Sequence, residues 1–311
     1  MVEDNQITAQ ISPFAIRKGE IKTFDGKDGY VSMNQIVHKI NIGHITDIHF
    51  AILDLVNEFE FMTSRQLFQM LEIKGYEVKS QDKLNTKLEQ LVKSKILTRY
   101  YFTSDEGKGI YRIYCLEKMG KYLLNSKEVE CKWQPSDNTK PVAMIKKRLA
   151  GNQIIIAYLR KVKAFDSYIV KPSITAKVAG KLFKASGGAI KLTKNNKSIQ
   201  FLFEVIRREM DWQKKFVEKA KLYKDFYENF VPGDSGFSSL PQLIFVCEDE
   251  KHMAETFKEI VKNNIEIPGI KLYFTTDLRQ NKETLEETLV EFKLVDEKYK
   301  MEDVELKLLG M

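Results

Sequence analysis

Three successive segments between His44 and Leu124 carry apolar residues at the spacing of helices that each bury one face. They read HITDIHFAILDLVNEFEF, MTSRQLFQMLEIKGY and SQDKLNTKLEQLVKSKIL. Thr63 or Ser64 is expected to cap the second helix, Gly75 to end it, and Ser80 to cap the third, because these residue types satisfy free backbone groups at helix ends. The expected buried faces comprise Ile45, Ile48, Ile52, Leu55 and Phe59, then Leu67, Phe68 and Leu71, then Leu84, Leu88 and Leu91.

The pattern then changes from helical to extended. In LTRYYFTSDEGKGIYRIYCL, two β-rich runs flank the turn formers from Asp105 to Gly109, which predicts a hairpin. Three short helices followed by a hairpin are typical of a winged helix-turn-helix, so residues 44–126 are interpreted as a DNA-binding domain that places one helix in the major groove. The same architecture also serves protein contacts, and this alternative stays open.

The third helix and the hairpin supply the expected DNA-binding side chains. Leu84, Leu88 and Leu91 define the inner side of the helix, and the opposite side is rich in lysine, amide and hydroxyl groups. Lysines neutralise phosphates, whereas Gln and Thr address base edges. The expected contacts are Lys79, Lys83, Thr86, Gln90 and Lys93 on the helix and Arg99, Lys108 and Arg112 on the hairpin.

Breaks in composition divide the rest of the chain. Residues 1–43 form a polar arm, with one strand expected near Tyr30–Ile36, and residues 127–141 contain two prolines and are interpreted as a linker. Residues 142–311 predict a helix, three strands, a long helix from Glu209 to Asn229, a strand, a helix near Lys251–Lys262 and a final strand. This order favours a mixed sheet with helices on both faces, so the fold class is α+β or α/β.

Charge is distributed unevenly along the chain. Residues 44–126 carry 12 Lys and Arg against 11 Asp and Glu, whereas residues 140–224 carry 21 against 5 and residues 225–311 carry 10 against 19. A basic segment attracts phosphate backbones without reading sequence. The second domain is therefore a candidate for a non-specific DNA contact, although a lysine-rich surface that is only solvated gives the same count.

Other classes of protein find less support. No run of residues reaches the roughly 20 apolar positions of a membrane span, and the start of the chain, MVEDNQITAQ, lacks the features of a signal peptide. Three scattered cysteines indicate reduced thiols, and the histidines have no cysteine at zinc spacing, so a cytoplasmic protein without a metal or other cofactor is expected.

Four stretches together resemble the replication-relaxation family of plasmid and mobile-element proteins. They are the helical segment with MTSRQL, the segment KRLAGNQIIIAYL, the run FEVIRRE leading into KKFVEKAKLYKDFY, and PQLIFVCEDE followed by LYFTTDL, so the likeness covers about residues 44 to 290. It implies a restriction-endonuclease-like fold for residues 142–311. It also implies a plasmid-encoded protein that acts in replication, conjugative transfer or their regulation.

Nuclease chemistry of the restriction type needs an Asp on one strand and a Glu-x-Lys on the next, which bind Mg²⁺ and activate water. Glu204 occupies the position of the Glu, but Ile206 stands where the lysine is expected and Gly187-Gly188 where the Asp is expected. Asp166 comes too early for the motif. Glu204 is therefore interpreted as a vestigial residue, paired with Arg207, Arg208 or a lysine, and no catalytic or metal-binding residue is assigned.

Two classes of function remain. The first is a double-stranded DNA-binding protein whose second domain is a degenerate nuclease that dimerises or adds DNA contacts, with replication or transfer proteins as further partners and no membrane. The second is a Mg²⁺-dependent endonuclease with an atypical site. Phosphate-loop and nucleophile-elbow motifs are absent from the sequence, as is the His-x-His of relaxases.

Overall fold

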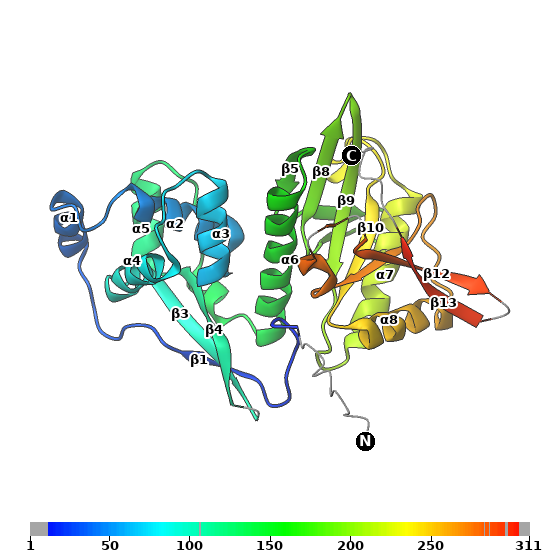
Figure 1. Cartoon of the computed structure of the whole chain (residues 1–311), viewed down its shortest axis with the longest axis horizontal. Helices are drawn as coiled ribbons and strands as arrows, with labels where there is room; N and C mark the ends of the chain where they lie inside the picture. The colour runs from blue at the N-terminus through cyan, green and yellow to red at the C-terminus, as the bar shows by residue number, and fades with distance from the viewer. Residues whose placement is uncertain (1–11, 106, 283, 286, 296–297, 305–311) are drawn as a thin grey trace, which may run out of the picture.

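The computed structural model describes residues 12–105, 107–282, 284–285, 287–295 and 298–304. Two units lie side by side, a largely helical one that includes a small sheet and one built on a large mixed sheet (Figure 1). The chain is therefore a mixed α+β protein, as the sequence indicates. Helix α6 of the second unit stands at the boundary with the first.

In the first unit, three helices precede a hairpin, and a short strand between the first two helices joins the hairpin as an additional strand. This short strand, β2, pairs antiparallel with β4, which gives the strand order β1-β3-β4-β2. The elements are α2 (Asp47–Phe59), β2 (Met62–Thr63), α3 (Ser64–Ile73), α4 (Gln81–Lys93), β3 (Leu97–Ser104), β4 (Gly107–Leu116) and α5 (Lys118–Ser126).

The helix ends follow from the residues that the sequence singles out. Thr63 accepts a hydrogen bond from the backbone of Gln66, whose side chain binds back to the backbone of Thr63. Ser80 caps α4 in the same way by accepting from the N–H of Lys83. Gly75 follows α3 with φ +77°, a conformation that glycine adopts without strain. The expected caps of α3 and α4 are therefore confirmed.

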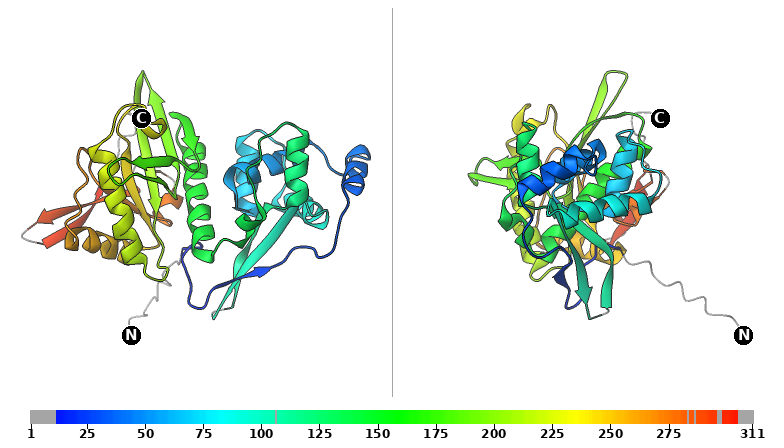
Figure 2. Two further views of the ribbon diagram at one scale, coloured as in Figure 1. Left: turned by 180° about the vertical axis from the view of Figure 1, so that it is seen from behind. Right: turned by 90° about the vertical axis from the view of Figure 1, so that its left-hand side faces the viewer.

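Residues 12–43 run from the junction of the two units along the hairpin to the far side of the first unit (Figures 1 and 2). They form β1 (Ile21–Phe24), which pairs antiparallel with β3, and α1 (Met33–Asn41). The strand expected near Tyr30–Ile36 is wrong. Ser32 and Gln35 form a capping box there and start a helix, whose Ile36 is fully buried.

The second unit is a seven-stranded mixed sheet with a separate two-stranded hairpin, β6 and β7. The strand order in the large sheet is β13-β12-β11-β10-β9-β8-β5. The elements are α6 (Val142–Lys161), β5 (Phe165–Ile169), β6 (Ser173–Ala176), β7 (Lys181–Lys184), β8 (Ala189–Lys194), β9 (Lys197–Val205), α7 (Trp212–Glu228), β10 (Gln242–Cys247), α8 (Glu250–Lys262), β11 (Tyr273–Thr276), β12 (Leu289–Val295) and β13 (Lys298–Val304), with three short 3-10 turns, Pro135–Thr139, Asp234–Gly236 and Arg279–Asn281.

Strand register decides which side chains face which helix. β5, β8 and β9 are antiparallel neighbours, and β9, β10 and β11 run parallel, with α7 and α8 as the connections. Successive side chains of a strand point to opposite faces. Phe201 and Phe203 of β9 accordingly belong to the core on the α6 side, whereas Leu202 belongs to the core formed with α7 and α8. Glu204 shares the α7 face.

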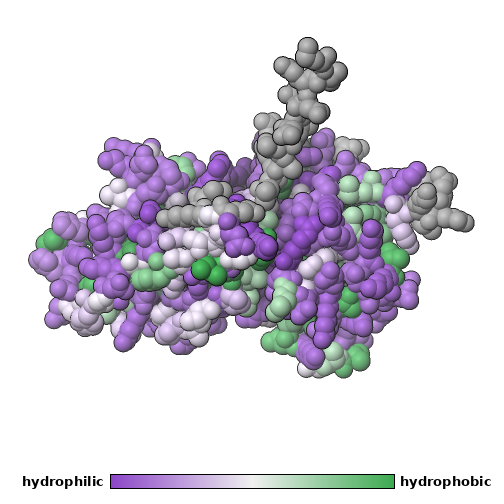
Figure 3. All heavy atoms as spheres, turned by 90° about the horizontal axis from the view of Figure 1, so that it is seen from below, coloured by the Kyte–Doolittle hydropathy of each residue, from purple (hydrophilic) through white to green (hydrophobic). Residues whose placement is uncertain are grey.

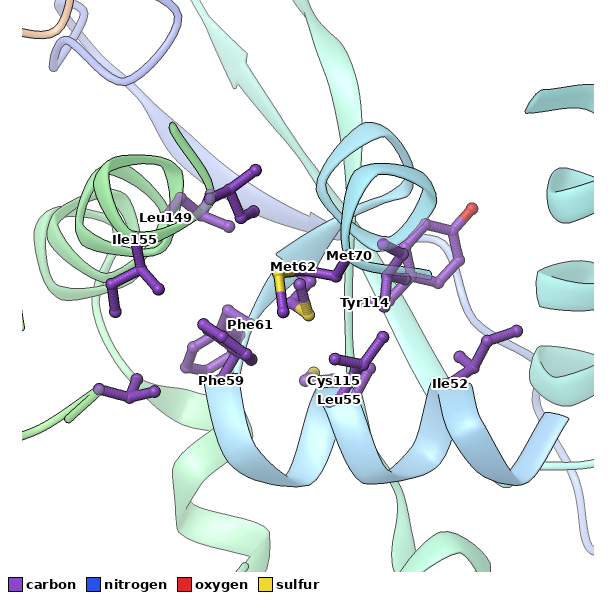
Figure 4. Packing of buried hydrophobic residues seen from close by; sticks show 14 of the residues in the cluster. Ile52, Leu55, Phe59, Phe61, Met62, Met70, Tyr114, Cys115, Leu149 and Ile155 are labelled. Atoms are coloured by element: carbon purple, nitrogen blue, oxygen red, sulfur yellow. The ribbon is translucent and has the colours of Figure 1, made fainter. Parts of the chain in front are cut away.

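The two units share one apolar core. Phe59 and Phe61 at the end of α2 pack toward Leu149 and Ile155 of α6 (Figure 4). Asn152, fully buried in the middle of α6, donates through Nδ2 to the carbonyl oxygens of Phe59 and Phe61, 3.2 and 2.7 Å away. These apolar contacts and hydrogen bonds together hold the two units in a fixed relative position.

Hydrophilic residues dominate the face seen from below, where apolar residues are confined to small patches (Figure 3). In the part of the chain that the structure describes, no helix combines the length and the apolar character that crossing a bilayer requires.

Candidate nucleic-acid interface

The outer face of α4 carries the side chains expected to contact DNA. Lys79, Lys83, Thr86, Gln90 and Lys93 are all exposed, and Leu84, Leu88 and Leu91 are fully buried beneath them. Lys93 forms a loose ion pair with Glu89 at 3.7 Å, whereas no ion pair engages Lys79 or Lys83 within the described residues. These two ammonium groups are thus free to meet phosphates.

The side chain of Gln90 is held by His49, a residue that the sequence analysis does not include in the interface. His49 of α2 is buried and accepts a backbone hydrogen bond from Thr46 through Nδ1, so its Nε2–H donates to Oε1 of Gln90 at 3.0 Å. Burial lowers the pKa of His49 and keeps the ring neutral. The amide of Gln90 is therefore oriented with its NH₂ group as the end available to a ligand.

The basic residues of the hairpin differ in how accessible their side chains are to a DNA phosphate. Arg99 is only 11% exposed and forms ion pairs with Glu89 and with Asp25 of the arm, the latter at 2.9 Å. Arg112 also pairs with Asp25, at 3.0 Å, but is half exposed. The side chain of Lys108 lies outside the described residues. Arg99 is consequently a structural link between hairpin and arm, and Arg112 is the hairpin arginine that remains open to solvent.

Glu204 lies near the end of β9 and is almost completely buried. Its two carboxylate oxygens accept from the backbone N–H of Ser186 at 3.2 Å and its hydroxyl at 2.8 Å, from Lys219 at 2.7 Å and from the Tyr223 hydroxyl at 2.7 Å. Of the pairings expected for Glu204, the structure contains the one with a lysine, Lys219. Arg207 and Arg208 are not its partners, because they bind Asp277 and, in the case of Arg208, Asp249 and Glu255.

The positions next to Glu204 explain why a second carboxylate is missing. A Cβ atom at Gly187 would lie 2.6 Å from Cβ of Phe203, and Gly188 has φ +85°, so neither position accommodates an Asp without movement of the backbone. Asp166 pairs with Lys191, which is in register with Gln200. Four residues of strand, about 13 Å, separate Gln200 from Glu204, so Asp166 is not part of this site.

A cavity of about 70 Å³ adjoins Glu204 and contains one other carboxylate, Glu209. Burial opposes the ionisation of Glu209, but hydrogen bonds from Lys147 and Lys215 prevail and lower its pKa. The two carboxylates and three lysines that line this cavity form lysine–carboxylate pairs. Among the described residues, no group of three potential His, Cys, Asp or Glu metal ligands comes together.

A larger hollow, which we call the basic cleft, opens between the two units with a volume of about 590 Å³. Its walls come from the end of α2, the segment before α6, α6 itself, and the β6–β7 hairpin with its flanks. The excess of lysine and arginine in residues 140–224 predicts a basic surface. The sequence does not predict where this surface lies, because its position depends on how the two units pack. The cationic residues that line it are Lys132, Lys140, Lys147, Arg148, Lys171, Lys184 and Lys219.

Comparison with known proteins adds no further assignment: the chain matches no protein-family model, and no curated protein sequence matches it.

Proposed function

We propose that this chain is a double-stranded DNA-binding protein that reads DNA with a winged helix-turn-helix formed by residues 44–126. The observation that carries the proposal is the outer face of α4, where Thr86 and the oriented amide of Gln90 follow Lys83 and Lys79, two lysines without an ion pair among the described residues. The helix–strand–helix–helix–hairpin order around α4 supports it, because in winged helices the helix in this position enters the major groove.

The second unit is proposed to be a restriction-endonuclease-like domain that has no complete catalytic site. The succession α6, β5, β8, β9, α7 and β10, with an antiparallel meander followed by a parallel strand, agrees with that fold. Together with the four sequence stretches, it supports a role in the replication, conjugative transfer or regulation of a plasmid or other mobile element.

The helix assignment is tested by substitutions on α4 in the full chain. Lys83→Ala is expected to weaken binding to all duplexes and to lower the slope of log K against log salt by about 0.9, the value for one phosphate contact. Gln90→Ala is expected instead to reduce the discrimination between the preferred and other sequences by about 1–3 kcal/mol. Both are measured by fluorescence anisotropy on a duplex selected from a random pool.

Lys118→Ala on α5 removes the same charge from an exposed position of the same unit and serves as the control. The assignment of α4 is rejected if Lys83→Ala and Gln90→Ala bind with the affinity, salt slope and sequence preference of the wild type.

A Mg²⁺-dependent endonuclease is the second candidate, favoured by the presence of two carboxylates, Glu204 and Glu209, at one cavity with lysines. The proposal predicts instead that the protein leaves supercoiled plasmid uncut in Mg²⁺ or Mn²⁺, because the oxygens of Glu204 are occupied by protein donors. Glu204→Gln is expected to retain duplex binding. Nicking by the wild type that both Glu204→Gln and Glu209→Gln abolish, with the fold preserved, would establish the nuclease.

A further inference from the structure

The basic cleft contains more positive charge than its own carboxylates can balance. Seven cationic side chains line it, against two acidic ones, Glu60 and Asp137. It lies between the two units, and its lining does not include α4. Any ligand of the cleft is therefore recognised separately from duplex DNA on α4.

Three of these cations converge on a single carboxylate. Lys140, Arg148 and Lys171 all form ion pairs with Glu60, the first at 2.9 Å and the second at 3.3 Å. Lys140 also contacts Asp137 at 2.8 Å, so the cluster of five side chains keeps one unbalanced positive charge. Arg148 is nearly buried: its Nη1 donates to the carbonyl oxygen of Val170 at 2.6 Å, and its Nε faces Glu60 without the geometry of a hydrogen bond. Such a cluster favours the arrival of an anion.

A fourth cation increases the imbalance on the β6–β7 hairpin, where Lys184 is in register with Ser173, two residues after Lys171. Lys184 ends β7, its side chain is exposed, and no described carboxylate pairs with its ammonium group. Lys147 and Lys219 also line the cleft and are bound to Glu209 and Glu204. Burial lowers the pKa values of Arg148 and Lys171, and the nearby Glu60 offsets this effect only in part.

The size and the remaining lining of the cleft indicate what kind of anion fits. A volume of about 590 Å³ matches a small-ligand site. Trp133, which is partly exposed, also lines the hollow and provides aromatic surface beside the cations. Cations next to aromatic rings are the combination that binds single nucleotides along a strand.

We propose that the basic cleft is a binding site for nucleotide phosphates, with Lys140, Arg148, Lys171 and Lys184 as the phosphate-binding residues. The nucleotide is supplied either by a single DNA strand or as a free nucleoside triphosphate. This site goes beyond the proposed duplex recognition by α4 and does not depend on it.

The test uses the full chain carrying Lys171→Gln and Lys184→Gln. Lys184 has no partner to strand, and Glu60 keeps Lys140 and Arg148 when Lys171 is replaced, so the fold is expected to persist. A labelled oligothymidylate of about a dozen nucleotides is one probe and dTTP, added as a competitor or titrated by calorimetry, is the other. The double variant is expected to bind at least one probe about tenfold more weakly. For the oligonucleotide, two lost contacts lower the salt slope by about 1.4.

Lys258→Gln with Lys262→Gln on α8 is the matched control, because it removes the same charge from exposed positions outside the cleft. Loss of oligonucleotide binding in the cleft variant alone identifies a strand as the source of the phosphate, and loss of dTTP binding alone identifies a free nucleotide. The proposal is overturned if neither probe binds the wild type, or if the cleft variant and the control bind equally. Duplex binding of the cleft variant and of Lys83→Ala, measured in parallel, separates this result from failure of the α4 assignment.

Discussion

Single residues determine whether the second unit can form a metal-binding site of the restriction type. Gly187 lies against Phe203 so closely that no side chain fits, and this contact excludes the Asp that a restriction-type site requires. Glu204 remains on the sheet, but Ser186, Lys219 and Tyr223 occupy its oxygens. The sequence alone shows Gly187-Gly188 and Glu204 at the positions where a restriction-type site would have its Asp and its Glu. It could not identify Lys219 and Tyr223 as partners, because they come from a helix whose rotation about its axis depends on the packed sheet.

His252 makes stability depend on pH. It is fully buried, its Nδ1 accepts from the backbone of Glu248, and its ring meets Trp212 edge to face at 4.7 Å. Burial, together with the nearby Arg208 and Arg207, lowers its pKa to about 3, below the ordinary 6.5. Between about pH 6.5 and pH 3, His252 therefore binds a proton in the unfolded chain but not in the folded chain. The resulting stability is complete above about pH 6.5 and is lost as the pH falls toward 3.

Between pH 7 and pH 5, this residue is expected to reduce the free energy of unfolding by about 2 kcal/mol. His252→Gln, which does not titrate, is expected to remove that part of the pH dependence. Urea denaturation of both proteins at the two pH values measures the difference. Parallel pH profiles would show that His252 is protonated in the folded state or exposed to solvent.

Elements were predictable where their signals are local. Helices α2, α3 and α4 and the strands β8, β9 and β10 have periodic apolar residues and clear boundaries, and they lie where the sequence places them. Strands β1 and β13 lie at sheet edges, β7 lies in a separate hairpin and β12 lies next to the edge strand β13; these strands depend on their pairing partners more than on their own pattern. Likewise, Arg99 was expected to face DNA because nothing in its neighbourhood reveals Asp25, 74 residues away in the arm.

We predict that a buried ion pair between Glu20 and Lys146 holds residues 12–20 of the arm against α6. Lys146 of α6 is 1% exposed and pairs with Glu20 at 2.6 Å. Glu20→Gln is expected to lower the free energy of unfolding by about 3 kcal/mol, because it leaves the lysine charge buried without a carboxylate. Adding Lys146→Met is expected to recover most of that loss. Urea denaturation of the two single variants and the double variant tests this coupling, and additive effects would show that Glu20 and Lys146 act independently.

At the scale of the whole molecule, charge and packing are segregated. In the second unit, the basic residues 140–224 include α6, which borders the first unit, whereas α8, β12 and β13 of the acidic remainder lie on the side away from it (Figure 1). Positive potential is thereby concentrated around the junction that contains the basic cleft. The charge count revealed the imbalance, but its spatial meaning required the sheet order, which places β11, β12 and β13 at the far edge.

The junction itself predicts cooperative unfolding of the two units. Asn152→Ala would leave the carbonyl oxygens of Phe59 and Phe61 buried without these donors, at a cost of about 1–3 kcal/mol. Because the bonds cross between units, this variant is expected to unfold over a broader range with a lower denaturant slope. Circular dichroism during urea denaturation measures both. A transition of unchanged steepness would mean that the apolar contacts alone couple the units.

The arm also has a consequence for the order of events during synthesis. The hydroxyl of Ser12 hydrogen-bonds to the carboxylate of Asp277, which lies 265 residues later, beyond the end of β11. Ribosomes add about 5–20 residues per second, so on the order of 10–50 s pass between the appearance of these two partners. The backbone N–H of Ile16 likewise lacks its acceptor, the carboxylate of Glu248, for most of that interval. Residues 12–16 are thus among the last segments to reach their place, and a growing chain exposes them to chaperones and proteases until the sheet is built.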